Sequence, residues 1–276
     1  EGRELRDAWI QVKGPAIVAL GEGKVPDDVA DSAETVIDAK GALAIPGMVN
    51  THHHLYQTFQ RNVPFVQDAK LFDWLVGLYE IWRELRPEDV NVSAMVGLSE
   101  LLLTGCTTVA DHFYVFPNGQ TPHLLDETIE AARKVGVRFH PSRGSMSRGR
   151  SLGGLPPDDV VQKPEEILLD SERVIQQYHD ASRFSMCRLA LAPCSPFSVT
   201  DDLLIESAKL ARKHGVRLHT HLAETKDEDD FCLQMVGCRP VDYMERVGWL
   251  GPDVWYAHGV YLNDDELRRM AAVGTG

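Results

Sequence analysis

Basic residues, cysteines and long hydrophobic runs are all scarce in this sequence. Its 276 residues include 28 Lys and Arg against 41 Asp and Glu, which gives a formal net charge of -13. So acidic a chain argues against nucleic acid or an anionic membrane as partner, because both repel negative charge. The apolar runs, such as VSAMVGLSELLLTG at 92–105, are interrupted by polar residues and are too short to span a bilayer. We therefore expect a small-molecule partner.

Cysteine usage and size limit the class of protein further. The cysteines are few and odd in number, and no CxxC occurs: Cys106, Cys187, Cys194, Cys232 and Cys238. This usage is typical of a reduced, cytoplasmic protein. With 43% hydrophobic residues, the chain can form one large core with a small appendage.

The pattern of hydrophobic residues changes at about residue 45. Residues 1–44 carry the short strand-like pieces AWIQV and AIVAL, separated by Gly, Pro and Asp, which predict a small β appendage. Over residues 45–276, apolar runs of strand length alternate with amphipathic stretches of helix length. That alternation predicts βα units around a parallel sheet, an α/β fold.

A short internal repeat supports this organisation. ARKVGVRFH at 132–140 and ARKHGVRLH at 211–219 each combine a basic helix end, a glycine and an apolar strand that ends in His. We interpret both copies as equivalent helix-to-strand junctions of one barrel.

Six strand–helix units follow from the pattern. We predict strands at 44–52, 107–112, 137–140, 188–193, 216–221 and 254–258. We predict helices at 90–103, 124–135, 165–179, 202–214, 241–247 and 264–274. A TIM-type (β/α)8 barrel has eight units, and six strands cannot close it. The expectation is therefore a barrel that lacks its last two strands.

Polar residues gather at the predicted strand ends, where such barrels hold their chemistry. In IPGMVNTHHHLYQ at 45–57, strand alternation places His52 and His54 on one face and His53 on the other. A further pair, His219 and His221, ends the fifth strand. His221 is nearer the strand end, so we choose it as the third ligand and assign a structural role to His219.

Three imidazoles suit a divalent metal ion, zinc first, with iron as an alternative, at Zn–N distances of about 2.0–2.1 Å. Such an ion lowers the pKa of a bound water to roughly 7 and so supplies a nucleophile. Glu224, three residues beyond His221, is well placed for general acid–base work. His258, at the next strand end, is placed to polarise a substrate or to orient the water.

The motifs PGMVNTHHH, HLAET and AHGVYL resemble the strand-one, strand-five and strand-six signatures of the amidohydrolase superfamily, in its deaminase and chlorohydrolase branch. The resemblance implies a (β/α)8 barrel with a small β-sandwich, to which residues 1–44 would contribute. It also implies zinc on His52, His54 and His221, proton transfer by Glu224 and assistance by His258. The segments HLYQTFQRNVP, LFDWLVGLYEIW and RGSMSRGRSLGGLPPDDVV resemble more narrowly the 8-oxoguanine deaminases and the hydroxyatrazine ethylaminohydrolases.

The sequence departs from that branch in one respect. Members use a fourth ligand, an Asp after strand eight, which this sequence does not contain. Asp111 follows strand two, and we assign it a structural or substrate-side role. The chain alone is therefore expected to bind metal weakly. The predicted fourth strand, in CRLALAPCSPFS, carries no Lys to bridge two ions, which favours a single metal and an aminohydrolase over a cyclic-amide hydrolase.

Three residues are candidates for substrate binding. The Gln57 carboxamide can donate to and accept from a purine edge, with a surface amide as the alternative. Trp74 is the candidate for a ring-stacking wall, although helical spacing also fits a core residue. Arg143 can reach a substrate carbonyl from the Gly-rich segment 142–159, which we expect to form a loop over the barrel mouth, or it can face solvent.

We therefore expect hydrolytic deamination of an oxidised or hydroxylated aromatic heterocycle, with 8-oxoguanine, giving urate and ammonia, as first candidate. One rival is an N-alkyl aminohydrolase of hydroxylated s-triazines, which uses the same site. Another is a non-catalytic metal-binding barrel, and a third is a fold in which the histidines only cap strands. A homo-oligomer is compatible with all of them.

Overall fold

The computed structural model describes residues 4–276, and its backbone contacts divide the chain into two compact units after Pro46. In the first unit, β1 (Ala8–Lys13) and β2 (Ala16–Glu22) form an antiparallel hairpin, and the short helix α1 (Asp27–Asp31) follows. The two predicted strand pieces are therefore confirmed as a two-stranded sheet.

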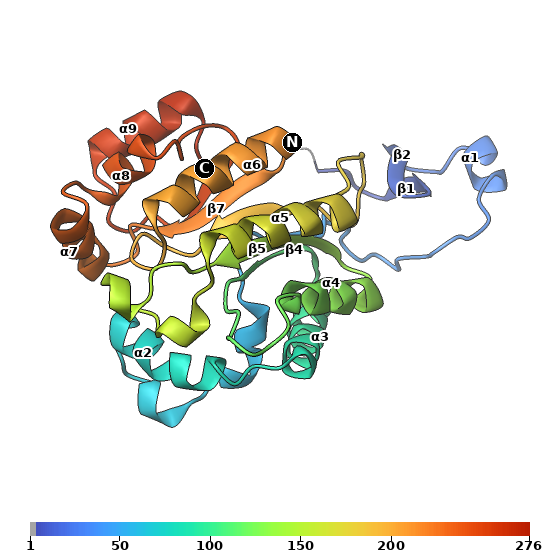
Figure 1. Cartoon of the computed structure of the whole chain (residues 1–276). Helices are drawn as coiled ribbons and strands as arrows, with labels where there is room; N and C mark the ends of the chain where they lie inside the picture. Colours follow the sequence, from blue (N-terminus) through green and yellow to red (C-terminus); the bar gives the residue numbers. More distant parts are fainter. Residues whose placement is uncertain (1–3) are drawn as a thin grey trace. The chain divides into compact units, whose positions relative to one another are not determined.

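The second unit is built on a parallel sheet of six strands in chain order, which Figure 1 shows as curled. Its strands are β3 (Met48–Asn50), β4 (Cys106–Phe113), β5 (Arg138–Ser145), β6 (Ala190–Pro193), β7 (Arg217–Leu222) and β8 (Val254–His258). Each strand pairs in parallel with the next along the chain. The six predicted strands and their parallel sheet are confirmed.

Helices connect these strands and pack on the sheet. They are α2 (Leu71–Trp82), α3 (Pro87–Leu103), α4 (Leu124–Val135), α5 (Pro164–Tyr178), α6 (Asp201–His214), α7 (Lys226–Met235), α8 (Pro240–Arg246) and α9 (Asp264–Val273). A 3-10 helix, η1 (Leu55–Gln60), follows β3. No helix between residues 4 and 276 is long and apolar enough to cross a membrane.

The two copies of the internal repeat occupy equivalent junctions, as predicted. Gly136 ends α4 with φ +79°, and Gly215 ends α6 with φ +66°; in each case a strand begins two residues later. Both glycines adopt the left-handed conformation that side chains with a Cβ disfavour. These turns bring each strand back to the sheet beside its predecessor.

Four strands differ in length from the prediction, and the differences in β3 and β5 have consequences for the site. β3 ends at Asn50, so His52 and His54 lie beyond the sheet ladder on an extended segment. β5 runs on to Ser145 because it pairs with β4 up to Phe113 and with β6 from Ser142. The predicted loop over the barrel mouth therefore begins later, after Ser145.

Candidate metal and catalytic site

Six histidine rings converge beside the ends of four strands. They are His52, His54, His112, His219, His221 and His258. The ring centroids of His52 and His54 are 4.7 Å apart, and that of His221 lies 5.0 and 5.1 Å from them. The three predicted ligands therefore meet, although 167 residues separate His54 from His221.

The HHH segment alternates as predicted even without strand pairing. His52 and His54 face one another, whereas His53 lies toward Gly97 of α3: a Cβ added there would be 4.0 Å from the His53 ring. The same Cβ would come within 2.8 Å of Leu55 and Thr58. Glycine at position 97 thus lets η1 pack closely on α3, which fixes the segment that carries the histidines.

Hydrogen bonds fix the tautomers of His54 and His221. The Nδ1 of His54 lies 2.7 Å from the carbonyl oxygen of His112, and the Nδ1 of His221 lies 2.7 Å from that of Cys194. Because a carbonyl only accepts, each Nδ1 carries the hydrogen. Each Nε2 then presents a lone pair, and these two nitrogens are 3.1 Å apart.

His52 is oriented through His219. The Nδ1 of His219 donates to the carbonyl of Trp255 (3.0 Å), which leaves its Nε2 as an acceptor. The Nδ1 of His52 lies 2.9 Å from that acceptor and must donate to it. The Nε2 of His52 is then also a free lone pair. This hydrogen bond sets the tautomer of a proposed ligand, and the structural role of His219 stays a prediction.

Burial keeps these rings neutral. Desolvation, with smaller contributions from neighbouring histidines, lowers the pKa of His52 to about 4, and desolvation lowers that of His219 to about 3. Desolvation by burial also holds the pKa values of His54 and His221 well below the ordinary range. A metal ion binds the neutral form of imidazole, so the rings are in the binding state at neutral pH.

The donor set fits a zinc-like ion. Two nitrogens on one tetrahedral zinc are roughly 3.3–3.4 Å apart, from Zn–N distances of about 2.0–2.1 Å. The 3.1 Å between the Nε2 atoms of His54 and His221 is close to this spacing, and with no hydrogen between them the two lone pairs repel unless a cation lies beside them.

Several histidine sets could hold an ion. Ligand atoms lie within 4.8 Å of one another in three trios: His52, His221 and His258; His52, His112 and His219; His54, His112 and His221. The predicted trio is not one of these three as a whole, but His221 shares a trio with each of the other two predicted ligands. His112, which the sequence analysis did not assign, occurs in two trios. Its Nε2 donates to the carbonyl of Ala192 (2.8 Å), and its buried Nδ1 has no partner among the described residues.

The predicted proton carrier lies beside this cluster. An oxygen of Glu224 is 3.5 Å from the Nε2 of His258, and the His258 ring stacks 5.3 Å from that of His221. Burial raises the pKa of Glu224 to about 7, so this carboxyl can both hold and release a proton near neutral pH. His258 has a φ of +78°, a rare conformation for a residue with a Cβ and one often found at functional sites.

Asp111 supports the segment that carries His54. One of its oxygens accepts from the backbone N–H of Leu55 (2.8 Å), and the carboxyl is 1% exposed. Burial raises its pKa to about 7. These contacts agree with the structural role that the sequence suggested.

Of the three candidates for substrate binding, Gln57 contacts a tyrosine beside His54, and Trp74 is connected to that tyrosine through Trp82. The side chain of Gln57 donates to the hydroxyl of Tyr56 (3.1 Å), whose ring lies 6.2 Å from that of His54. Trp74 is partly buried on α2 and lies 5.5 Å from Trp82, which in turn contacts Tyr56.

Arg143 is buried in an ion pair, and the expectation that it contacts substrate or faces solvent is wrong. It is 1% exposed and forms an ion pair with Asp170 of α5 (2.8 Å). A further nitrogen donates to Gln162 (3.0 Å), and its guanidinium lies 3.7 Å over the ring of Phe116. The reason is that β5 extends through position 143, where strand alternation directs the side chain toward the helices.

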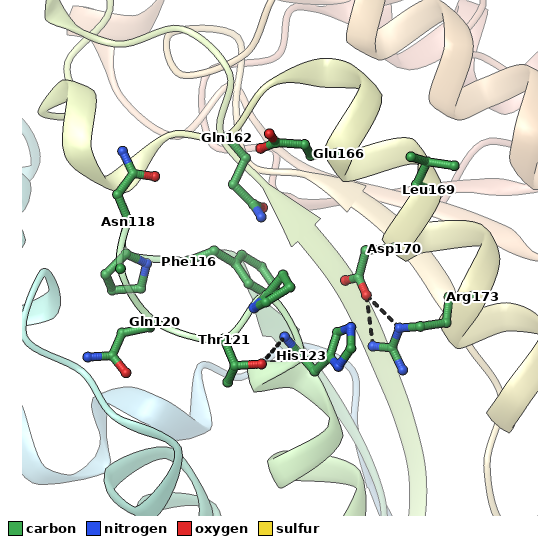
Figure 2. A pocket seen from close by; sticks show the side chains of 13 residues that line it. Phe116, Asn118, Gln120, Thr121, His123, Gln162, Glu166, Leu169, Asp170 and Arg173 are labelled. Carbon is green, nitrogen blue, oxygen red and sulfur yellow. Dashed lines mark hydrogen bonds and ion pairs between the residues drawn. The ribbon is translucent and has the colours of Figure 1, made fainter.

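The hollow drawn in Figure 2 is also separate from the histidines. It measures about 460 Å³ and lies between the loop after β4 and α5. Phe116, His123, Gln162 and Arg173 are among its lining residues, and no histidine of the cluster is. We therefore assign the chemistry to the strand ends and not to this hollow.

A curled parallel sheet that gathers neutral imidazoles and a carboxyl at its strand ends is the arrangement expected of a metal-dependent hydrolase. The amidohydrolase family model matches residues 43–275, and the chain belongs to this family.

Within the amidohydrolase family, the chain is similar to several proteins of named activity. The chain is 49% identical to the 8-oxoguanine deaminase of Pseudomonas aeruginosa over 275 residues, all of this chain and 60% of that protein. It is 35% identical to the hydroxydechloroatrazine ethylaminohydrolase of Pseudomonas sp., covering 58% of it. The crystal structure of the atrazine chlorohydrolase TrzN from Arthrobacter aurescens, complexed with zinc, superposes with a TM-score of 0.93 at 36% identity, over 99% of this chain and 61% of that one. The chain thus spans about three fifths of the length of these relatives.

Proposed function

We propose that this chain holds the metal-binding and proton-transferring residues of a hydrolytic deaminase that acts on an oxidised or hydroxylated aromatic heterocycle, with 8-oxoguanine as first candidate. The observation that carries the proposal is that the rings of His52, His54 and His221 lie with their centroids 4.7 to 5.1 Å apart, next to His258 and the partly buried Glu224. The 49% identity to an 8-oxoguanine deaminase supports the choice of substrate.

His52, His54 and His221 would hold the ion, zinc or else iron. When bound, it supplies the Lewis acidity that makes a water nucleophilic near neutral pH. Glu224 would take one proton from the attacking water and pass it to the ring nitrogen, and would then take the second from the hydroxyl formed on the ring carbon and pass it to the leaving amino group. His258, 3.5 Å from Glu224, orients the water or a substrate oxygen. Water adds at the amino-bearing carbon, the C–N bond breaks, and a carbonyl and ammonia result.

Two residues are proposed to contact the substrate. Gln57, one turn beyond His54, is proposed to recognise the purine edge through its carboxamide. Trp74, connected through Trp82 to the aromatic cluster beside His54, is proposed to stack on the heterocycle.

At the level of the fold, we propose that residues 1–44 form part of a small β-sandwich and that residues 45–276 belong to a hydrolase barrel of the (β/α)8 type. The antiparallel hairpin and the six-stranded parallel sheet support these two assignments. A cytoplasmic location and a homo-oligomeric state stay predictions.

The test is product release by the purified, zinc-loaded protein. With 8-oxoguanine we expect ammonia and urate in equal amounts, and neither product from the His221→Ala protein. Absence of ammonia from a protein that holds one zinc per chain would refute the proposal and favour a non-catalytic metal-binding barrel.

A second candidate is supported by the 35% identity to the hydroxydechloroatrazine ethylaminohydrolase. A hydroxylated s-triazine with an N-alkylamino group would lose an alkylamine at the same site. Comparing kcat/KM for this triazine and for 8-oxoguanine decides between the two proposed activities, because both use the same catalytic residues and differ only in the fit of the substrate pocket.

A further inference from the structure

The chain turns sharply directly after β7, between the proposed ligand His221 and the proposed proton carrier Glu224. Ala223 has a φ of +52°, which takes the chain out of the sheet ladder. The backbone N–H groups of Ala223 and Glu224 therefore have no strand to bond to, although Ala223 is buried and Glu224 is partly buried. Buried N–H groups need partners.

Glu228 supplies both partners. One oxygen of its carboxyl accepts from the N–H of Ala223 (2.8 Å), and the other accepts from the N–H of Glu224 (3.0 Å). The side chain is 0% exposed, which is unusual for a carboxyl on a helix as acidic as α7. Thr225, the N-cap residue directly before the helix, does not cap it with its side chain: its buried hydroxyl has no partner in the described part of the chain.

The opposite side of the turn is held as well. The carbonyl of Leu222 accepts from the N–H of Gly259 (3.0 Å), and the carbonyl of Ala223 accepts from the N–H of Tyr261 (2.9 Å). Both donors belong to the loop that follows His258. The turn that carries Glu224 is therefore fixed between Glu228 on one side and the His258 loop on the other.

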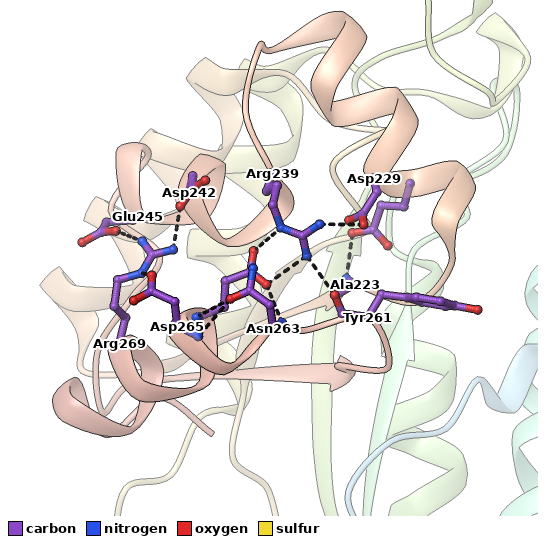
Figure 3. Close-up of polar contacts among 11 residues, drawn as sticks. Ala223, Asp229, Arg239, Asp242, Glu245, Tyr261, Asn263, Asp265 and Arg269 are labelled. Carbon is purple, nitrogen blue, oxygen red and sulfur yellow. Dashed lines mark hydrogen bonds and ion pairs between the residues drawn. The ribbon is translucent and has the colours of Figure 1, made fainter.

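Arg239 joins these two sides (Figure 3). Its guanidinium donates to the carbonyl of Tyr261 (2.9 Å) and to the carboxylate of Asp229 (2.9 Å), the residue next to Glu228 on α7. It also forms two hydrogen bonds with Glu266 of α9 (2.8 and 2.9 Å). The helix that carries Glu228 and the loop after His258 are thus held together through one side chain.

We propose that Glu228 is a positioning residue that sets the backbone of Glu224 and so the reach of its carboxyl to the cluster. This rests on the proposed role of Glu224 as proton carrier. In this role Glu228 contacts neither substrate nor ion. It acts by accepting hydrogen bonds from the backbone N–H groups of Ala223 and Glu224. A misplacement of about 1 Å can cost roughly 100-fold in rate, so such a support bears on turnover.

The test compares Glu228→Gln with Asp230→Asn, a matched loss of one carboxylate from an exposed position of the same helix. Gln keeps one acceptor but turns an NH2 group toward one of the two N–H groups. We expect kcat to fall about 10- to 100-fold while KM stays within about twofold and zinc content stays equal to the wild type. The Asp230→Asn protein should match the wild type. An unchanged kcat in Glu228→Gln, or a loss of zinc together with activity, would overturn the proposal.

Amide hydrogen exchange tests the positioning without relying on activity. In the wild type, the amides of Ala223 and Glu224 should be protected from exchange although they lie outside the strand ladder. In Glu228→Gln they should exchange at least about ten times faster than in the wild type. The exchange rates of the β7 amides should be the same in both proteins. Unprotected amides in the wild type, or a loss of protection throughout β7, would contradict it. If the wild type proves inactive on every heterocycle, the proposed function fails while this measurement still decides the role of Glu228.

Discussion

The Nε2 atoms of His54 and His221 lie 3.1 Å apart, and neither ring has a hydrogen to place between them. The Nδ1 hydrogens of both are donated to backbone carbonyls, and burial keeps both rings uncharged. A folded chain that brings two such lone pairs together from positions 167 residues apart gains stability when a cation binds them.

Replacing His221 by Ala should weaken zinc binding further. The change removes one of the three proposed ligands, so we expect affinity to fall by more than about 100-fold. Metal analysis after dialysis against a weak chelator measures this. His53→Asn is the matched control, since His53 lies on the opposite side, toward Gly97, and this protein should retain zinc. Equal zinc in His221→Ala and the wild type would argue against His221 as a ligand.

The metal-free protein should lose stability as the pH falls from 7 to 5. Folding lowers the pKa values of the six clustered histidines below the ordinary 6.5, to about 4 for His52 and about 3 for His219. The unfolded chain therefore binds more protons than the folded chain in this window, and protonation favours unfolding.

Three carboxyls act in the opposite direction, because desolvation raises the pKa values of Asp111, Glu224 and Glu228 to about 7. The six histidines outnumber them, so we expect Tm to drop by more than about 5 °C between pH 7 and pH 5. Thermal scans in the presence of a chelator measure the drop. A Tm that rises on acidification would show that the carboxyls dominate.

Glu224→Gln should separate chemistry from metal binding. The amide cannot shuttle a proton, so kcat should fall about 10²- to 10⁴-fold while zinc content stays the same. Ammonia release from 8-oxoguanine measures the rate, and Asp227→Asn, an exposed change on the following helix, is the control. Robust turnover by the Glu224→Gln protein would remove the role of proton carrier.

Arg143→Ala should destabilise the fold without changing substrate affinity. The substitution leaves Asp170 buried with fewer partners, which costs about 3 kcal/mol in the free energy of unfolding. Urea denaturation measures the cost, and Arg133→Ala, in an exposed ion pair, should be close to neutral. A large rise in KM with unchanged stability would instead indicate that Arg143 contacts the substrate.

Much of the fold follows from local pattern. The helix of residues 124–135 was predicted at its observed bounds, because its apolar face and its terminal glycine are both visible in the sequence. The alternation of HHH also predicted which two rings meet. These features depend on backbone periodicity and on caps, which a few neighbouring residues determine.

Other features depend on contacts between distant segments and could not be predicted. The helix α7 was missed because KDEDD has the composition of a solvated loop, although Glu228 within it is fully buried. Arg143 was misplaced because only pairing with β4 and β6 extends β5 through it. The position of His112 within two possible ligand trios likewise depends on where β4 lies beside the histidines of other strands.

The measurement that tests this account most directly is anomalous diffraction at the zinc edge from crystals of the zinc-loaded protein. We predict one peak, about 2.0–2.1 Å from the Nε2 atoms of His52, His54 and His221. A crystal that holds zinc but shows no peak among these three nitrogens, or shows it only on His112 and His219, would contradict the central claim.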